Sequence, residues 1–176
     1  ARRLDRDLHA GQAGGVDVRR IHRDGRRAAE ARELLAQTFA TLQSKGKLTA
    51  DQASAATGRL AVAGSLADLA GCDVVVEAIV ESLDAKRALF AELEALVSPQ
   101  CVLATNTSSL SVTAIAAGLK RPQRVAGWHF FNPVPLMKIV EVIDGLLTDR
   151  AVGEFLLALG RRVVHTAVRA QDTPGF

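Results

Sequence analysis

From Ala28 onward, the chain alternates between segments with a helical spacing of apolar residues and short apolar runs of strand length. Apolar positions at 34, 35, 39 and 42 predict an amphipathic helix that ends near residues 45–46. Thr49 and Gln52 match a capping box, which predicts the start of a second short helix. The same spacing predicts further helices near 89–97, 111–118 and 149–160.

Short apolar runs between these helices predict the strands 60–63, 73–80, 101–104, 124–128, 137–143 and 162–168. The run 73–80 is nearly continuous, as expected of a strand that is covered on both faces. Strands separated by helices favour an α/β fold with a doubly wound, largely parallel sheet. Because such sheets bind ligands beyond the carboxyl ends of their strands, we expect the functional residues just after Val80, Ala104 and Trp128.

The first 27 residues depart from this alternation. Their glycine cluster, Gly11 to Gly15, lacks the G-x-G-x-x-G spacing and follows no apolar strand. Val18 and Ile21 stand among arginines, so no buried strand is predicted there. We therefore expect a doubly wound fold that lacks an intact first strand and a glycine-rich turn.

The composition narrows the possible classes of protein. Hydrophobic residues make up 48% of the 176 positions and charged residues 23%, which is typical of a globular domain. No apolar run approaches the roughly 18 residues of a membrane helix, so no membrane partner is expected. The two cysteines, Cys72 and Cys101, are too few for a disulfide scaffold and too isolated for a zinc site. We expect no metal site and a reducing, cytoplasmic location.

The net charge of +3 comes from the start of the chain. Residues 1–32 hold nine arginines and five acidic residues, which leaves 13 basic and 14 acidic residues for the remainder. A basic segment of this kind can bind nucleic acid. This one contains no aromatic residue to stack on bases and no zinc or helix-turn-helix pattern, so we expect no nucleic-acid partner.

A histidine and a glutamate are the strongest candidates for catalysis. Glu141 lies in the predicted strand 137–143 with apolar residues on each side, where an ionised carboxylate needs a partner. His129 and Asn132, in the preceding turn, are the nearest candidates along the chain. A carboxylate that fixes a histidine tautomer is a common general-base arrangement. The alternative is that the histidine and the glutamate form a buried pair that stabilises the turn and has no catalytic role.

Two further groups follow predicted buried strands. Thr105 to Ser109 is a polar cluster before a helix, and one of its hydroxyls is expected to cap that helix. Because one hydroxyl suffices, Ser108 is available to face the crevice. Glu81 and Lys86 lie just past the run 73–80, where they form either a solvated helix start or a ligand contact.

Four segments resemble the L-3-hydroxyacyl-CoA dehydrogenase family in order and in separation: Val74 to Glu81, Ala104 to Leu110, Trp128 to Ile143 and Asp172 to Phe176. The resemblance runs from about Ala28 to Phe176 and implies a Rossmann-like fold. The form Asn-Pro-Val-Pro-Leu-Met-Lys is similar to stand-alone enzymes such as 3-hydroxybutyryl-CoA dehydrogenases. The multifunctional β-oxidation proteins usually carry a histidine where Pro135 stands.

The resemblance implies a reaction and a role for each matching residue. The enzyme would interconvert L-3-hydroxyacyl-CoA and 3-ketoacyl-CoA with NAD, in fatty-acid or related metabolism. His129 would be the general base and Glu141 its partner, Ser108 would hydrogen-bond the 3-oxygen of the substrate, and Asn132 would hold substrate and cofactor. The implied NAD contacts are Glu81, Lys86, Ser108 and Asn132. The implied contacts to the CoA substrate are Thr38, Lys45 and Ser108.

The resemblance also implies a domain organisation. Residues 1–27 form an atypical basic segment, residues 28–176 form the NAD-binding and catalytic domain, and we expect the family's C-terminal helical domain, through which the parent enzyme would form a homodimer, to be absent. Only Asp24 is a candidate for the acid on the adenosine ribose. A shifted reading frame or a decayed gene would explain residues 1–27. The alternative function is a non-catalytic member of the family that binds no dinucleotide.

Overall fold

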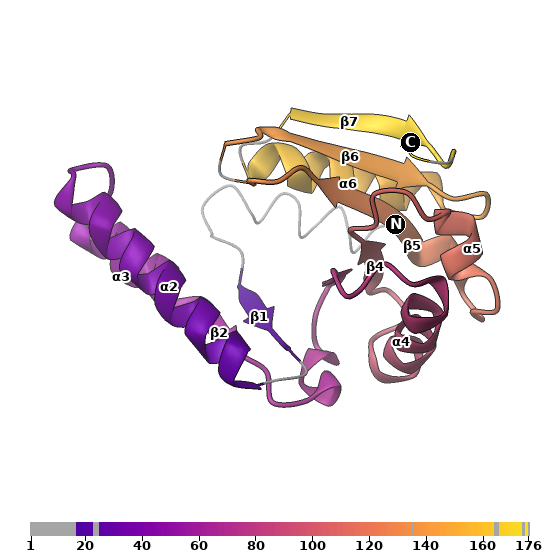
Figure 1. Ribbon diagram of the computed structural model, residues 1–176, viewed down its shortest axis with the longest axis horizontal. Coiled ribbons are helices and arrows are strands. Elements are labelled where there is room, and N and C mark those ends of the chain that lie inside the picture. The colour runs from indigo at the N-terminus through magenta and orange to yellow at the C-terminus, as the bar shows by residue number, and fades with distance from the viewer. Residues whose placement is uncertain (1–16, 23–24, 135, 164–165, 174, 176) are drawn as a thin grey trace. The chain divides into compact units, whose positions relative to one another are not determined.

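The computed structural model describes residues 17–22, 25–134, 136–163, 166–173 and 175, and they form two compact units (Figure 1). The first unit ends at Leu69 and the second begins at Ala70. None of the helices in these ranges is both long and apolar enough to cross a lipid bilayer.

The first unit combines one long and one short helix with a two-stranded sheet. Its elements are β1 (Val18–Arg20), α2 (Gly25–Ser44), α3 (Ala50–Gly58), β2 (Leu60–Val62) and a 3₁₀ turn (Leu66–Leu69). β1 and β2 are parallel neighbours. Arg32 connects α2 to this pair, because its Nε donates a hydrogen bond to the carbonyl oxygen of Leu60 at 2.9 Å.

The strand β1 was not predicted, and α2 begins at Gly25 rather than near Ala28. Val18 is 44% exposed, so the prediction that this segment forms no buried strand agrees with the structure. β1 forms nonetheless, because main-chain pairing with β2 needs no apolar side chains. The pattern of apolar residues identifies only buried strands, so it did not predict β1.

The capping box predicted for the first unit is confirmed. Thr49 Oγ1 accepts the N–H of Gln52, and the Gln52 side chain accepts the N–H of Thr49. Asp68 likewise accepts the N–H groups of Gly64 and Ser65 at 2.8 and 3.0 Å. These bonds satisfy main-chain donors that a helix start leaves without partners inside the helix.

The second unit contains a five-stranded sheet in the order β3-β4-β5-β6-β7, of which Figure 1 labels β4 to β7. β3, β4 and β5 are parallel, β6 runs antiparallel to β5, and β7 is parallel to β6. The mostly parallel α/β architecture predicted from the sequence is thus confirmed. The elements are β3 (Val74–Glu77), α4 (Leu83–Leu96), β4 (Val102–Thr105), α5 (Val112–Ala116), a 3₁₀ turn (Pro122–Arg124), β5 (Val125–Phe130), β6 (Ile139–Asp144), α6 (Arg150–Arg162) and β7 (Thr166–Gln171).

Helices cover both faces of this sheet. On one face Ala126 and Trp128 of β5 pack with Leu156 of α6 in the main apolar cluster. On the other face Gly127 lies against α5, where a Cβ atom would be 3.1 Å from a methyl carbon of Val112. Because side chains alternate along a strand, His129 projects from the same face as Gly127.

Two strand predictions differ from the structure. β3 ends at Glu77, and Val76, Ile79 and Val80 are 43%, 42% and 69% exposed, so the expected burial on both faces is wrong. Among the described residues of this sheet β3 is an edge strand, and the Glu77 carboxylate accepts the N–H of Ile79 and turns the chain. The strand expected at 162–168 begins only at Thr166, because α6 continues to Arg162.

Candidate active site

His129 and Glu141 form a cross-strand pair. The antiparallel register of β5 and β6 places the two residues directly opposite each other. His129 Nδ1 lies 2.9 Å from Glu141 Oε2, and the two side chains are 14% and 21% exposed. With Nδ1–H donated to the carboxylate, Nε2 is the nitrogen that can accept a proton. Of the two partners that the sequence offered for Glu141, the structure selects His129.

Asn106 ties the end of β4 to both neighbouring strands. Its N–H donates to the carbonyl oxygen of Glu77 at 2.8 Å, and its side-chain oxygen accepts the N–H of Phe130 at 2.9 Å. These bonds hold the loop that contains Ser108 at the edge of the sheet where β5 carries His129. Sequence reasoning missed Asn106, although it stands inside the polar cluster that was singled out.

Glu81 holds the loop after β4. Its Oε1 accepts the N–H of Ser108 at 3.1 Å and the hydroxyl of Thr107, and its Oε2 lies 3.2 Å from Lys86 Nζ. Burial raises the pKa of Glu81, but the hydrogen bonds from Thr107 and Ser108 and the Lys86 cation outweigh it, so the pKa is lowered. Glu81 is therefore ionised at neutral pH, and Ser108 itself is exposed.

Lys86 lies inside the protein. Its side chain is 1% exposed, and its Nζ is 2.7 Å from Oε1 of Glu77, which is equally buried. The other oxygen of Glu77 accepts the hydroxyl of Thr105 at 2.7 Å. Sequence reasoning assigned no role to Glu77, because in an apolar run it gave no signal beyond its charge.

The N-cap of α5 is not where the sequence placed it. Ser111, rather than a residue of the cluster 105–109, accepts the N–H of Ala114 at 3.1 Å. The Asp172 carboxylate accepts the N–H groups of Val112 and Thr113, each at 2.8 Å. Burial raises the pKa of Asp172, but these hydrogen bonds and those from the Ser111 and Thr113 side chains outweigh it, so the pKa is lowered.

The remaining predicted site residues are more scattered. Asn132 is exposed in the turn after β5. Thr38 and Lys45 belong to the first unit, where both are exposed and Thr38 Oγ1 donates to the Leu34 carbonyl oxygen at 2.8 Å. Asp24 and the glycine cluster near Gly11 lie outside the described residues.

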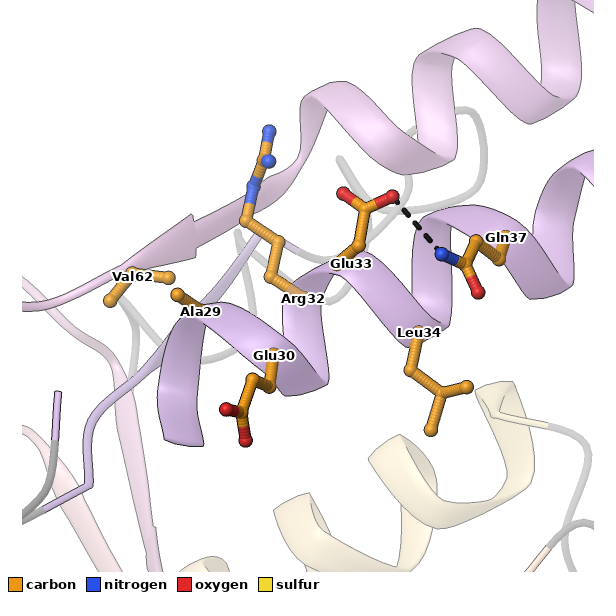
Figure 2. A pocket seen from close by; sticks show the side chains of 7 residues that line it. All are labelled: Ala29, Glu30, Arg32, Glu33, Leu34, Gln37 and Val62. Carbon is orange, nitrogen blue, oxygen red and sulfur yellow. Dashed lines mark hydrogen bonds between the residues drawn. The ribbon is translucent and has the colours of Figure 1, made fainter. Parts of the chain in front are cut away.

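The first unit also carries a shallow surface hollow of about 660 Å³ between α2 and β2 (Figure 2). Glu33 and Gln37 are hydrogen-bonded to each other at 3.3 Å on its wall, and Leu34 is 65% exposed. Neither Thr38 nor Lys45 lines it. The charged and apolar side chains that line the hollow do not point toward a common centre, so they do not form a candidate catalytic site.

A doubly wound α/β sheet with polar side chains at the carboxyl ends of its parallel strands defines a Rossmann-like nucleotide-binding domain. The sequence matches the family described as "3-hydroxyacyl-CoA dehydrogenase, NAD binding domain" over residues 9–173. The chain therefore belongs to this family, and the predicted family and cofactor are confirmed. The match includes most of the segment 1–27 that sequence analysis left outside the resemblance.

Individual relatives agree with the family. The chain is 49% identical over 133 residues to a 3-hydroxyadipyl-CoA dehydrogenase of Escherichia coli K12, covering 76% of this chain and 28% of that protein. It is 42% identical over 137 residues to a 3-hydroxybutyryl-CoA dehydrogenase of Bradyrhizobium diazoefficiens, covering 76% of this chain and 45% of that protein. The crystal structure of 3-hydroxybutyryl-CoA dehydrogenase from Escherichia coli K12 superposes with a TM-score of 0.89 at 42% identity, covering 92% of this chain and 34% of that one. The chain thus spans less than half of the length of each.

Proposed function

We propose that this chain is the NAD-binding, base-carrying part of a dehydrogenase that interconverts L-3-hydroxyacyl-CoA and 3-ketoacyl-CoA. The observation that supports this most directly is the 2.9 Å contact between His129 Nδ1 and Glu141 Oε2. A histidine held in one tautomer by a carboxylate is suited to take a proton from a hydroxyl group. The names of the relatives above, which are 3-hydroxyacyl-CoA dehydrogenases, support the same reaction.

In the proposed mechanism, His129 Nε2 takes the proton of the substrate's 3-hydroxyl group. Glu141 stabilises the imidazolium that forms, and Ser108 donates a hydrogen bond to the 3-oxygen. Asn132 orients the substrate and the cofactor. NAD, when bound, accepts the hydride that leaves C3.

The described residues fit one half of the cofactor NAD, the nicotinamide and its ribose. The Glu81 side chain is 39% exposed and ionised, and the Ser108 side chain is exposed, so both can hydrogen-bond the ribose and nicotinamide. We assign Glu81, Lys86, Ser108 and Asn132 to this half. The chain contains no G-x-G-x-x-G sequence, so we assign no residue to the pyrophosphate.

The proposed substrate is a short-chain acyl-CoA thioester, because the relatives are named for 3-hydroxyadipyl-CoA and 3-hydroxybutyryl-CoA. Thr38, Lys45 and Ser108 are the proposed contacts to it. We further propose a cytoplasmic enzyme of fatty-acid metabolism whose parent protein is a homodimer.

The test is a fluorescence titration of the purified chain with NADH, followed by acetoacetyl-CoA. We expect saturable NADH binding, then NADH oxidation, and a rate about 10²- to 10⁴-fold lower in His129→Gln with unchanged NADH affinity. His22→Gln is the matched control, because His22 is exposed and lies in the first unit. Equal turnover in the wild type and His129→Gln would remove His129 as the base.

Two observations favour the second candidate, a family member that binds no dinucleotide. β3 is an edge strand of the described five-stranded sheet, and the chain lacks a glycine-rich phosphate turn. A folded chain that shows no saturable NADH binding would establish this candidate instead.

A further inference from the structure

The hydrogen bond to Glu141 fixes the imidazole of His129 in one respect only. It places Nδ1 at 2.9 Å from Glu141 Oε2, and the ring can still tilt about the line that joins these two atoms. The covalent geometry of the side chain does not prevent such a tilt, because the last torsion angle of a histidine is broadly distributed. The direction in which Nε2 points therefore depends on contacts to the face of the ring as well.

Phe131 supplies a contact of that kind. It follows directly after β5, two positions from His129, and its side chain is half-buried. The ring centroids of His129 and Phe131 are 4.6 Å apart, and the two ring planes are inclined at 54° to each other. Aromatic rings attract one another at centroid distances of about 4.5–7 Å. The phenyl ring therefore occupies space that the imidazole would need in order to tilt toward it.

Two neighbouring positions of Glu141 are apolar. Val168 lies opposite Glu141 on β7, and Ile143, two positions further along β6, is fully buried. Neither of these side chains can donate or accept a hydrogen bond, so neither competes with the imidazole for the Glu141 carboxylate. The carboxylate and the phenyl ring thus supply different restraints, the first on the position of Nδ1 and the second on the plane of the imidazole.

We propose that Phe131 is a positioning residue, which fixes the plane of the His129 imidazole so that Nε2 faces the 3-hydroxyl group of the substrate. This inference rests on the proposed function in taking His129 as the base. Phe131 carries no group that transfers a proton, so its effect passes through His129. Since a small misplacement of a catalytic group slows a reaction without changing what the protein binds, the effect falls on kcat.

The test is a cycle of four proteins in which kcat for the reduction of acetoacetyl-CoA is compared: wild type, Phe131→Ala, His129→Gln and the double variant. We expect Phe131→Ala to lower kcat about 10- to 100-fold and to leave the NADH dissociation constant unchanged. In the His129→Gln background the same substitution should have no further effect, because the ring that Phe131 positions is gone. Losses that multiply in the double variant would show that Phe131 acts independently of His129 and would overturn the proposal.

Two further variants serve as matched comparisons. Phe131→Tyr keeps an aromatic ring against the imidazole and should restore most of the wild-type kcat. Phe155 is also a half-buried phenylalanine, but it lies on α6 and packs against the apolar cluster on the other face of the sheet. We expect Phe155→Ala to lower stability and to leave kcat of the folded protein unchanged, with folding checked by Trp128 fluorescence. An equal fall of kcat in Phe155→Ala would mean that the loss of any half-buried phenyl ring slows the reaction, which contradicts positioning.

Imidazole ¹⁵N NMR of the ligand-free chain separates this inference from the proposed function. In wild type the contact with Glu141 selects one tautomer of His129, so the Nδ1 and Nε2 shifts should be well separated in alkaline solution. The signals are assigned by their absence from His129→Gln. In Phe131→Ala a tilting ring should lose this contact for part of the time, and the two shifts should approach each other, whereas Phe155→Ala should leave them unchanged.

The two experiments together give a decision in each case. A folded wild-type chain without turnover would contradict the proposed function alone, and the NMR shifts would then decide whether Phe131 positions the imidazole. Unchanged shifts in Phe131→Ala would overturn the inference, whatever the rate of that variant.

Discussion

The two units of the molecule use the same kinds of element but differ in what holds them together. In the first unit the buried apolar side chains among the described residues are Ala28, Ala53, Ala63 and Leu69. In the second unit, large side chains such as Phe90 and Leu156 are fully buried between a five-stranded sheet and helices on both of its faces. Main-chain pairing can form a two-stranded sheet, but only a packed core fixes side chains against one another.

This difference matches the distribution of the candidate site residues. The His129–Glu141 pair and the buried Lys86–Glu77 ion pair belong to the unit with the large core. Thr38 and Lys45, which the resemblance assigns to CoA binding, belong to the unit with the small one. We therefore expect a rigid second unit, and a first unit that opens locally at a much lower free energy.

The largest expected effect comes from removing a core side chain of the second unit. Leu156 is fully buried, and Leu156→Ala should reduce the free energy of unfolding by about 2–5 kcal/mol, through lost apolar burial and the cavity left behind. Urea denaturation followed by the fluorescence of Trp128, the single tryptophan, detects the unfolding of this unit. Leu34→Ala is the control, because Leu34 is 65% exposed and its loss should change stability by less than about 0.5 kcal/mol. Equal losses in the two variants would contradict the contrast between the units.

Alanine substitutions at one glycine in each unit test the same difference in packing. In Gly127→Ala the new Cβ would lie 2.8 Å from Ile143 Cβ and 3.1 Å from Val112 Cγ2, so overpacking should cost about 1–3 kcal/mol. In Gly58→Ala no atom lies within 4 Å of the new Cβ, and the reduced freedom of the unfolded chain should stabilise by about 0.4–1 kcal/mol. Thermal melts of both variants against wild type check the two signs. A Gly127→Ala protein as stable as wild type would show that the sheet is less tightly covered than the structure indicates.

Local pairs in the sequence were predictable. The His129–Glu141 contact joins strands that follow each other directly, and the apolar neighbours of Glu141 left few partners for its charge. The capping box joins Thr49 and Gln52, which are three positions apart, and depends only on the local chain. Contacts of this kind can be predicted from the spacing of residues along the chain, because a short segment can adopt few other arrangements.

Contacts between distant segments were not predictable. Thr105 meets Glu77, and Phe130 meets Asn106, across 28 and 24 residues respectively, and both contacts depend on the register of parallel strands joined by crossovers. The N-cap of α5 was misplaced for a related reason, because several hydroxyls precede that helix and only its actual start selects Ser111. β1 was missed because the apolar pattern identifies buried strands, and Val18 and Arg19 of this strand are exposed.

Capping variants give smaller effects that should also differ between the units. Thr49→Ala removes the cap of α3 and should cost about 1 kcal/mol of local helix stability. Because the first unit has a small core, this loss should appear in the helical circular dichroism without shifting the Trp128 transition. Ser111→Ala should shift the Trp128 transition by less than the loss of an N-cap usually does. The reason is that Asp172 still accepts two N–H groups at the same helix start. A Trp128 transition that moves equally in both variants would mean that the two units unfold together.

The smallest expected effect is a dependence of the second unit's stability on acid. Hydrogen bonds lower the pKa of Asp172 in the folded protein below its ordinary value, so its ionised form stabilises the fold above about pH 4, and this stability is lost as the pH falls through the lowered pKa. Burial raises the pKa of Asp144, which acts in the opposite direction: protonating it favours the folded state as the pH falls. Urea unfolding monitored by Trp128 at neutral pH and at about pH 3 should therefore show a smaller acid loss in Asp172→Asn than in wild type, and a larger one in Asp144→Asn. If Asp172→Asn loses as much stability in acid as wild type does, the cap that Asp172 provides does not depend on its charge.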